Sequence, residues 1–253
     1  MGYYSTIQKL PKIKKYQKKY NHSYSFGVYP TLELLKNRKH NVLKILVKKK
    51  GLENDGVREI IDICKKEGIH YEINDRLIEK VAYKENTYVI GIFEKYISKL
   101  EVNDNHVVLV NPSDMGNIGT IVRTMLGFGI KNLGIIEPSV DIFDPRVVRS
   151  TMGAFFKINF KHYSSIEEYL SEFSTHNYYP FMLGGKSNIS EIEFKEPFTI
   201  IQGNEGKGLD KKYMDIGHSV YIPHSKDIDS LNLSVATGIG LWEVFRKGRR
   251  VVS

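Results

Sequence analysis

Five polar side chains, in three separate segments of the sequence, have types that could act together in catalysis. They do not form a histidine-based site, because no histidine shares a motif with a nucleophile and none has the spacing of a zinc site. An asparagine, an arginine, an acid and a serine suit substrate positioning and electrostatic stabilisation better than covalent catalysis. The candidate catalytic residues are Asn117, Arg123, Glu205, Ser230 and Asn232.

The first segment predicts a helix that presents Arg123 on a surface without bulky side chains. The apolar residues that fix its core face at helical spacing are Ile118, Ile121, Val122 and Met125. Arg123 therefore points elsewhere, and its neighbours on the helix surface are Gly116, Gly119, Thr120 and Gly127. A substrate could approach such a surface closely. The alternatives are a surface arginine beside packing glycines and, for Asn117, a simple helix cap.

Three glycine-containing segments resemble nucleotide-binding loops but fail their spacing. The segment 203–208 does not follow the GxxxxGK[ST] pattern, and the segment 185–187 has Pro180 where that pattern requires its first glycine. The segment 127–129 supplies only two glycines of a dinucleotide fingerprint. These spacings disfavour an ATPase and a nicotinamide enzyme. Glu205 remains a lone acid between glycines, either paired with an arginine or placed in an ordinary turn.

The last quarter of the sequence predicts a small-ligand site. The strand-like runs 198–201 and 219–222 each lead into glycine or proline and then into small polar residues. Loops at the carboxyl ends of strands form the ligand sites of open α/β sheets. The segment 233–245 is apolar nearly all round, which predicts a buried helix, and either Ser230 or Asn232 could cap it. Two strand-end loops beside one buried helix are thus expected to hold a ligand.

Alternating strand and helix patterns predict an α/β protein with two domains. Residues 26–93 combine short strand candidates with helical spacing and predict a small α/β domain, followed by a polar linker at residues 94–105. Over residues 106–253, continuous apolar strands alternate with helices, which predicts a mostly parallel sheet with helices on both faces. The strand candidates before the last quarter are 42–47, 69–73, 87–93, 107–110, 133–136, 155–160 and 179–183.

The basic excess of the chain lies entirely near its amino terminus. Residues 1–50 contain thirteen Lys and Arg against the single acid Glu33, while the whole chain has a formal net charge of +8. A basic arm at residues 1–25 with interspersed tyrosines is typical of polyanion binding and of stacking on bases. The alternative is a solvated basic tail. Arg146 and Arg149, in a helix that begins at Asp144-Pro145, could also meet phosphates.

Cysteine content and hydropathy restrict the class of protein further. Cys64 is the only cysteine, so an internal disulfide is impossible and a cysteine-built metal site is not expected. Its place in an apolar helical pattern predicts a core position. No apolar run approaches the roughly 18 residues of a membrane span, and no signal peptide is recognisable. We therefore expect a soluble, cytoplasmic protein without a metal.

Taken together, the three polar segments resemble the three motifs of the SpoU (TrmH) branch of the SPOUT methyltransferases. The resemblance covers residues 106–247, and the order and spacing of three motifs make it specific. Residues 26–93 are, more loosely, similar to the ribosomal-protein-like RNA-binding domain of many relatives. The matching segments are Asn117-x-Gly-x-x-x-Arg123, Gly203-Asn-Glu205-Gly-x-Gly208-Leu, and Ile222-Pro223 followed by Ser230-Leu-Asn232-Leu-Ser-Val-Ala.

The resemblance implies S-adenosyl-L-methionine as methyl donor, a ribose 2′-hydroxyl of RNA as acceptor, and a homodimer. It also implies a carboxyl-terminal trefoil knot, a topology that is exceptional among proteins. The residues expected to bind the donor are Gly184, Gly203, Asn204, Ile222 and Leu231. The residues expected to contact RNA are Lys36, Arg38, Lys39, Arg146 and Arg149.

Within this family the arginine that corresponds to Arg123 is often given the role of general base. Arginine resists deprotonation in proteins. We therefore expect Arg123 to orient the adjacent phosphate and to stabilise the developing oxyanion, with Glu205 fixing the orientation of the guanidinium.

The sequence leaves the substrate open. The amino-terminal domain favours ribosomal RNA over transfer RNA, and phosphate contacts of the basic arm are expected to add affinity without nucleotide choice. A non-catalytic RNA-binding or ribosome-assembly protein on the same fold is an alternative, as is methylation of a base.

Overall fold

The computed structural model describes residues 11–248, which divide into two compact units. Unit 1 contains residues 11–96 together with Phe143–Phe156, and unit 2 contains Ile97–Ile142 together with residues 157–248. The segment Phe143–Phe156 therefore belongs to unit 1 by its contacts, although it follows the first strands of unit 2 in the chain. The domain limits expected from the sequence stay a prediction. No helix in the described part is both long and apolar enough to cross a bilayer.

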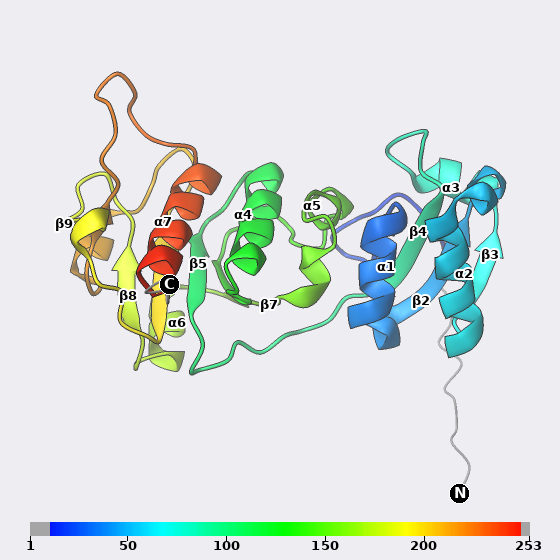
Figure 1. The fold of residues 1–253 in the computed structure, drawn as a ribbon, viewed down its shortest axis with the longest axis horizontal. Coiled ribbons are helices and arrows are strands. Elements are labelled where there is room, and N and C mark those ends of the chain that lie inside the picture. The colour runs from blue at the N-terminus through cyan, green and yellow to red at the C-terminus, as the bar shows by residue number, and fades with distance from the viewer. Residues whose placement is uncertain (1–10, 249–253) are drawn as a thin grey trace, which may run out of the picture. The chain divides into compact units, whose positions relative to one another are not determined.

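Unit 1 is built on a four-stranded mixed sheet with the strand order β1-β4-β2-β3. The strands are β1 (His22–Phe26), β2 (Val42–Val47), β3 (Tyr71–Ile73) and β4 (Val89–Glu94). Strands β1 and β2 run antiparallel to β4, and β3 runs parallel to β2. Its helices are α1 (Val28–Asn37), α2 (Asp55–Glu67), α3 (Asp75–Val81) and α5 (Pro145–Ser150), with α1 and α2 in contact side by side (Figure 1).

Helix α2 shows how local sequence sets an element of unit 1. Asn54 caps its start by accepting a hydrogen bond from the Val57 amide, and Gly68 ends it in the left-handed conformation at φ 69°. Its apolar face packs into the core beside α1 and β2. Cys64 is buried on this face, as expected, and burial raises the pKa of its thiol to about 11.

Strand β1 overlaps the end of the segment that the sequence predicted to be a basic arm, residues 1–25, so this end of the arm is an ordered strand. The limit between arm and domain stays a prediction. All five residues of the strand are buried. Their polar side chains have partners: the Ser23 hydroxyl donates to the Phe143 carbonyl at 2.5 Å, and the Ser25 hydroxyl pairs with that of Thr31 at 2.9 Å. Satisfied polar groups can occupy a core strand, which is why hydropathy missed it. Residues 1–10 of the arm lie outside the described residues.

Unit 2 contains a fully parallel five-stranded sheet with the order β7-β6-β5-β10-β8. Its strands are β5 (His106–Val110), β6 (Asn132–Ile136), β7 (Asn159–Tyr163), β8 (Asn177–Pro180) and β10 (Phe198–Gln202). A short parallel pair, β9 (Ser187–Asn188) and β11 (Val220–Tyr221), adjoins β8 through a bridge between Phe181 and Val220. All the carboxyl ends of the five parallel strands therefore meet at one edge.

Helices α4 (Met115–Gly127), α6 (Ile166–Glu172) and α7 (Leu233–Gly248) flank this sheet (Figure 1). Helix α6 packs with Val108 and Val110 of β5, whereas α4 and α7 contact each other. The expected α/β fold with a mostly parallel sheet and flanking helices is confirmed. The expected trefoil knot stays a prediction.

Helix α7 is less buried than its composition predicted. Val235 and Trp242 are 50% and 52% exposed, although Leu233 and Leu241 are buried. The helix is apolar on more than the face that packs against the rest of unit 2, so its composition is typical of a buried helix although one side of it is uncovered in the single chain.

Two strand limits also differ from the sequence expectation. Residues 154–157 form a short 3-10 helix rather than the start of a strand. Phe156 packs edge to face against both Phe155 and Phe93 of the same unit. Strand β8 ends at Pro180, earlier than the predicted limit at residue 183.

Candidate active site

The Glu205 carboxylate lies at the amino-terminal end of α4. One of its oxygens accepts hydrogen bonds from the Ser113 amide at 3.0 Å and the Ser113 hydroxyl at 2.7 Å, and the other accepts from the Asp114 amide at 3.0 Å. Burial raises the pKa of Glu205, but these hydrogen bonds outweigh it and hold the pKa below its ordinary value. The acid is thus kept ionised at a helix end that favours negative charge.

Asn117 connects Glu205 to Asn232. Its Nδ2 donates to a Glu205 oxygen at 3.3 Å, and its Oδ1 accepts from Asn232 Nδ2 at 3.1 Å. The side chain of Asn117 does not cap α4, because Asp114 does so by accepting from the Asn117 amide at 2.7 Å. The three sequence motifs therefore meet in one hydrogen-bonded chain of side chains.

Of the two candidate caps for α7, the structure selects Asn232. Its Oδ1 accepts from the Ser234 amide at 2.9 Å and the Val235 amide at 3.4 Å. Ser230 is exposed and makes no hydrogen bond with the described residues. Asn232 belongs to the network, and Ser230 does not.

Arg123 lies on the exposed side of α4 and forms no ion pair or side-chain hydrogen bond within residues 11–248. The expected pairing with Glu205 is absent from this part of the chain, because the carboxylate already accepts hydrogen bonds at the start of the helix. Arg123 is six residues beyond Asn117, about 9 Å along the helix axis. Its guanidinium is free to bind an external anion.

The loop after β10 requires a glycine at its first position. A Cβ on Gly203 would lie 2.2 Å from the backbone carbonyl carbon of Gly208 and 2.5 Å from the Leu209 nitrogen. The loop closes on itself here, since Asn204 and Gly208 exchange two backbone hydrogen bonds of 3.2 and 2.9 Å. Gly208 itself adopts φ 66°. Close backbone approach, rather than flexibility, explains Gly203.

Asn204 joins this loop to the end of β5. Its Nδ2 donates to the Asn111 carbonyl at 2.8 Å, while its Oδ1 accepts from the Gly206 and Lys207 amides at 3.0 and 3.2 Å. Asn111 adopts φ 51°, a left-handed conformation that asparagine tolerates better than most residues. The side chain of Asn204 holds the loop in shape, so its amide is not available to a ligand.

The loop after β8 places Gly185, rather than the predicted Gly184, against a neighbouring backbone. A Cβ on Gly185 would lie 2.4 Å from the Val220 carbonyl carbon, whereas one on Gly184 would meet only a methionine methyl at 3.6 Å. Gly185 directly precedes the β9–β11 pair, which leads to Ile222. Sequence reasoning missed this residue because adjacent glycines look alike.

The two remaining donor candidates follow the same edge. Ile222 follows β11, and its carbonyl lies 2.8 Å from His224 Nδ1. Leu231 is half-buried and directly precedes Asn232. The loops after β8, β10 and β11 all leave from the carboxyl ends of neighbouring parallel strands, which is the usual position of a ligand site in such sheets.

All five residues expected to contact RNA belong to unit 1, whereas the network around Glu205 belongs to unit 2. Two of them are lysines in ion pairs between exposed groups: Lys36 pairs with Glu59 at 3.4 Å, and Lys39 pairs with Glu67 at 2.6 Å. Such exposed pairs contribute little to stability and can exchange for an external phosphate.

The three arginines of this set differ in their surroundings. The Arg38 guanidinium lies 4.8 Å from the ring centre of Tyr96 and is half-buried. Arg146 forms two hydrogen bonds of 2.9 and 2.8 Å with Asp144, the cap of its own helix, which raises the pKa of the guanidinium. The Arg149 guanidinium has no ion pair in the described part. Their role in RNA binding stays a prediction.

Two observations limit the chemistry of the described residues. No group of three or more His, Cys, Asp or Glu side chains in residues 11–248 is arranged to hold a metal ion. Two buried histidines, His106 and His176, belong to a hydrogen-bonded core network with Tyr169 and Thr199 on the sheet. They are structural groups rather than part of the Glu205 network.

Known proteins resemble this chain over half of its length or more and, in some cases, over most of its length. An uncharacterised tRNA/rRNA methyltransferase of Synechocystis is 31% identical over 56% of this chain and 53% of that protein. The 23S rRNA (guanosine-2′-O-)-methyltransferase RlmB of Acinetobacter baylyi is 24% identical over 88% of this chain and 97% of its own. The chain spans about half the length of the relatives that it matches at 30% identity or more.

A solved structure of the SpoU methyltransferase AviRb from Streptomyces viridochromogenes, in complex with the cofactor AdoMet, has the same fold. Its TM-score is 0.81 over 91% of both chains, at 19% sequence identity. The model of the SpoU rRNA Methylase family matches residues 104–242, which include Asn117, Arg123, Glu205 and Asn232. The chain therefore belongs to the SpoU rRNA Methylase family.

Proposed function

We propose that this protein is an S-adenosyl-L-methionine-dependent methyltransferase that modifies a ribose 2′-hydroxyl of ribosomal RNA. The observation that carries the proposal is the hydrogen-bonded chain Glu205–Asn117–Asn232, which joins three distant motifs beside the strand-end loops. A protein that only bound RNA would not require these loops and this network together. The names of relatives support the reaction, since RlmB is a 23S rRNA 2′-O-methyltransferase.

The residues at the strand-end loops fit the methyl donor. Gly185 and Gly203 allow two backbone segments to approach so closely that a methyl side chain would overlap them. Bare backbone at the carboxyl edge of a parallel sheet offers amides and carbonyls to an adenosine-sized ligand. The residues proposed to bind the donor are Gly184, Gly185, Gly203, Ile222 and Leu231. Asn204 would shape the loop instead of touching the ligand.

S-adenosyl-L-methionine, held at the strand-end loops, would supply an electrophilic sulfonium methyl group for the ribose 2′-oxygen and would leave as the neutral thioether. Arg123 is proposed to bind the RNA phosphate next to that ribose and to stabilise the negative charge that develops on the 2′-oxygen. Asn117 and the ionised Glu205 hold the start of α4, and hence the helix that carries Arg123, against the donor loops. Arg123 is thus the catalytic residue of this set, and Asn117, Glu205 and Asn232 are positioning residues.

A homodimer is part of the proposal. The exposed Val235 and Trp242 lie on α7, and Trp242 also contacts the Phe128 ring at the end of α4. Exposed tryptophan beside other apolar groups is characteristic of interface centres. A second copy of the chain would cover this side of α7. Ribosomal RNA as the substrate would place the enzyme in the cytoplasm.

The proposal is tested by mapping 2′-O-methyl sites in RNA from cells with and without the protein. We expect at least one ribose in ribosomal RNA to lose its resistance to alkaline cleavage when the protein is removed. The site should return when wild-type protein is restored, but not with Arg123→Ala. If the 2′-O-methyl site that disappears lies in transfer RNA, transfer RNA is the substrate instead. Loss of a methylated base with all ribose sites intact would overturn the ribose assignment.

A further inference from the structure

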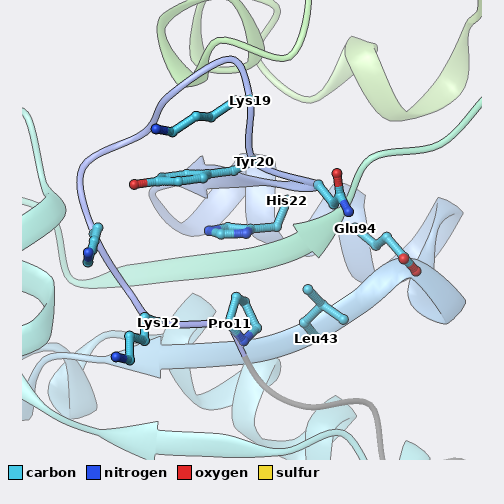
Figure 2. A pocket seen from close by; sticks show the side chains of 9 residues that line it. Pro11, Lys12, Lys19, Tyr20, His22, Leu43 and Glu94 are labelled. Carbon is cyan, nitrogen blue, oxygen red and sulfur yellow. The ribbon is translucent and has the colours of Figure 1, made fainter.

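Unit 1 contains a pocket of about 490 Å³ that belongs to none of the features above. It lies where the segment 11–20 passes over the ends of β1, β2 and β4, and Figure 2 shows the side chains that line it. Its volume falls within the roughly 300–1,000 Å³ of pockets that bind small molecules. The lining includes three lysines and one acid, Glu94, so its charge is positive.

One wall of the pocket is an aromatic stack. The rings of Tyr20 and His22 lie nearly parallel, 5° apart in plane with centroids separated by 5.2 Å (Figure 2). His22 is fixed from below, because its Nε2 pairs with the Tyr24 hydroxyl at 3.1 Å. Burial, and then the charge of Lys95, lower the pKa of His22, so its ring is neutral at pH 7. The stack therefore presents a rigid, uncharged aromatic surface, with Leu43 on another side of the pocket.

The three lysines of the lining, Lys12, Lys14 and Lys19, have no ion pair within residues 11–248. In the same unit, other lysines do pair with acids, such as Lys44 with Glu72 and Lys48 with Glu79. Three ammonium groups that share one pocket repel each other unless an anion lies between them. Their positive charge therefore exceeds the negative charge of Glu94, the one acid of the lining.

The segment that carries these lysines is anchored. The Tyr24 hydroxyl donates to the Lys14 carbonyl at 2.7 Å, and Lys95 Nζ donates to the Lys18 carbonyl at 2.8 Å. Lys95 also lies 4.9 Å from the ring centre of Tyr16. These contacts hold the backbone over the sheet before any ligand arrives, which lowers the entropic cost of binding.

We propose that this pocket binds one nucleotide of single-stranded RNA, with its base against the Tyr20–His22 stack and its phosphate among Lys12, Lys14 and Lys19. The aromatic wall would stack on the flat face of a base, and the lysine cluster would attract the negatively charged phosphate. Duplex RNA cannot enter, because its bases are already stacked. The choice of RNA as the source of the nucleotide rests on the proposed function, whereas the pocket chemistry does not.

The proposal changes the expected role of the amino-terminal segment. A tail that only touches phosphates would bind every RNA alike. A pocket for an unstacked base instead requires a single-stranded nucleotide at a fixed place in the substrate. Unit 1 would then select RNA that has a loop or bulge, independently of the methyl-transfer site in unit 2.

Binding of a fluorescent single-stranded RNA 12-mer to the full chain, without methyl donor, tests the pocket. The variant Lys12→Gln/Lys14→Gln/Lys19→Gln should weaken binding at least about tenfold and reduce the slope of log affinity against log salt by about 2. The charge-matched control Lys50→Gln/Lys65→Gln/Lys66→Gln, on exposed lysines of unit 1, should change affinity less than about twofold. Equal effects of the two triple variants would overturn the proposal.

Tyr20→Ala separates stacking from charge. It should weaken binding about tenfold with no change in the salt slope, because a ring releases no counterions. Tyr20→Trp should retain wild-type affinity, and Tyr29→Ala, which removes another exposed tyrosine of unit 1, should have no effect. Unchanged affinity in Tyr20→Ala would show that the ring does not stack on a base and would overturn the pocket proposal. Thermal melting checks that each variant is folded.

Further measurements identify the source of the nucleotide and distinguish this proposal from the proposed function. A mononucleotide should displace the 12-mer only at concentrations at least about a hundredfold higher than an unlabelled 12-mer, and equal potency would assign the pocket to free nucleotides instead. If no RNA is methylated but the pocket variants still lose binding, the proposed function fails and the pocket proposal stands. If RNA is methylated but the pocket variants bind the 12-mer like wild type, only the pocket proposal fails.

Discussion

Asn232 Nδ2 donates a hydrogen bond of 3.1 Å to Asn117 Oδ1 across 115 residues of the chain. Because that oxygen is engaged, the amide group of Asn117 must direct its Nδ2 to Glu205. The first turn of α4 and the cap of α7 are thereby fixed to the same carboxylate. The proposed reaction surface is defined by this chain of contacts more than by any single residue.

Asn117→Asp should disable the network while leaving the fold intact. The change removes the donor to Glu205 and places a second carboxylate within about 3.3 Å of it, a like-charge contact that is unfavourable. We expect methyl transfer to fall at least about tenfold, measured with radiolabelled donor on substrate RNA. Asn54→Asp, at the cap of α2, introduces the same charge where Asp is an equally good cap, and should be neutral. Similar activity in both variants would contradict the positioning role.

Arg123→Lys should reduce turnover by about a hundredfold, the typical effect of losing one donor to a developing oxyanion. A lysine preserves the charge but replaces a planar fork with a single point charge. Donor affinity, measured by calorimetry, should not change, because Arg123 is not among the residues proposed to bind the donor. Arg76→Lys, on the exposed side of α3, is the matched control. Near wild-type turnover of Arg123→Lys would show that the guanidinium is not required.

Much of the fold and of the candidate site could be predicted from the sequence. The parts that could not be predicted have definite physical causes. Apolar runs such as that of β5 identified the parallel strands, and motif spacing identified Asn117, Glu205 and Asn232. The cap of α4 is Asp114, whereas the sequence offered Asn117 as a possible cap; both are residue types that cap helices well and they stand three residues apart. Adjacent Gly184 and Gly185 differ only in what lies opposite them, which depends on the packing of β11.

The adjacent glycines after β8 provide a matched pair of variants. Gly185→Ala places a Cβ 2.4 Å from the Val220 carbonyl carbon, so the two backbones must separate, at a cost of about 1–3 kcal/mol in the free energy of unfolding. Donor affinity should fall with it. Gly184→Ala meets only the Met214 methyl at 3.6 Å and should change stability by less than about 0.5 kcal/mol. Chemical denaturation and calorimetry measure both; equal stability of the two variants would contradict the close approach.

Trp242→Glu should weaken the proposed homodimer. A charged group on the uncovered side of α7 cannot be buried against a second copy without a large desolvation cost. We expect the dimer dissociation constant, from sedimentation equilibrium, to rise at least tenfold, with the far-ultraviolet circular dichroism unchanged. Ile97→Glu, at a residue that is 95% exposed, should leave association unchanged. A monomeric wild-type chain at all concentrations would remove the dimer from the proposed function.

The buried histidine network makes the stability of unit 2 dependent on pH. His106 Nδ1 lies 2.8 Å from the Tyr169 hydroxyl, and its Nε2 lies 2.9 Å from the Glu101 carbonyl. Burial lowers the pKa of His106 from 6.5 to about 4. Between these two values the unfolded chain binds more protons than the folded one, so the free energy of unfolding decreases as the pH falls.

The free energy of unfolding is expected to decrease below about pH 6.5, by about 3 kcal/mol near pH 4. Burial also lowers the pKa of His176, which adds to this decrease. Urea denaturation at intervals from pH 8 to pH 5 measures the slope before carboxylates such as Glu205 begin to protonate. His106→Gln should be less stable than wild type at pH 8, but its free energy of unfolding should depend less steeply on pH, because glutamine does not titrate. His40→Gln, at an exposed position, should keep the wild-type slope. Parallel curves for wild type and His106→Gln would show that the proton binds elsewhere.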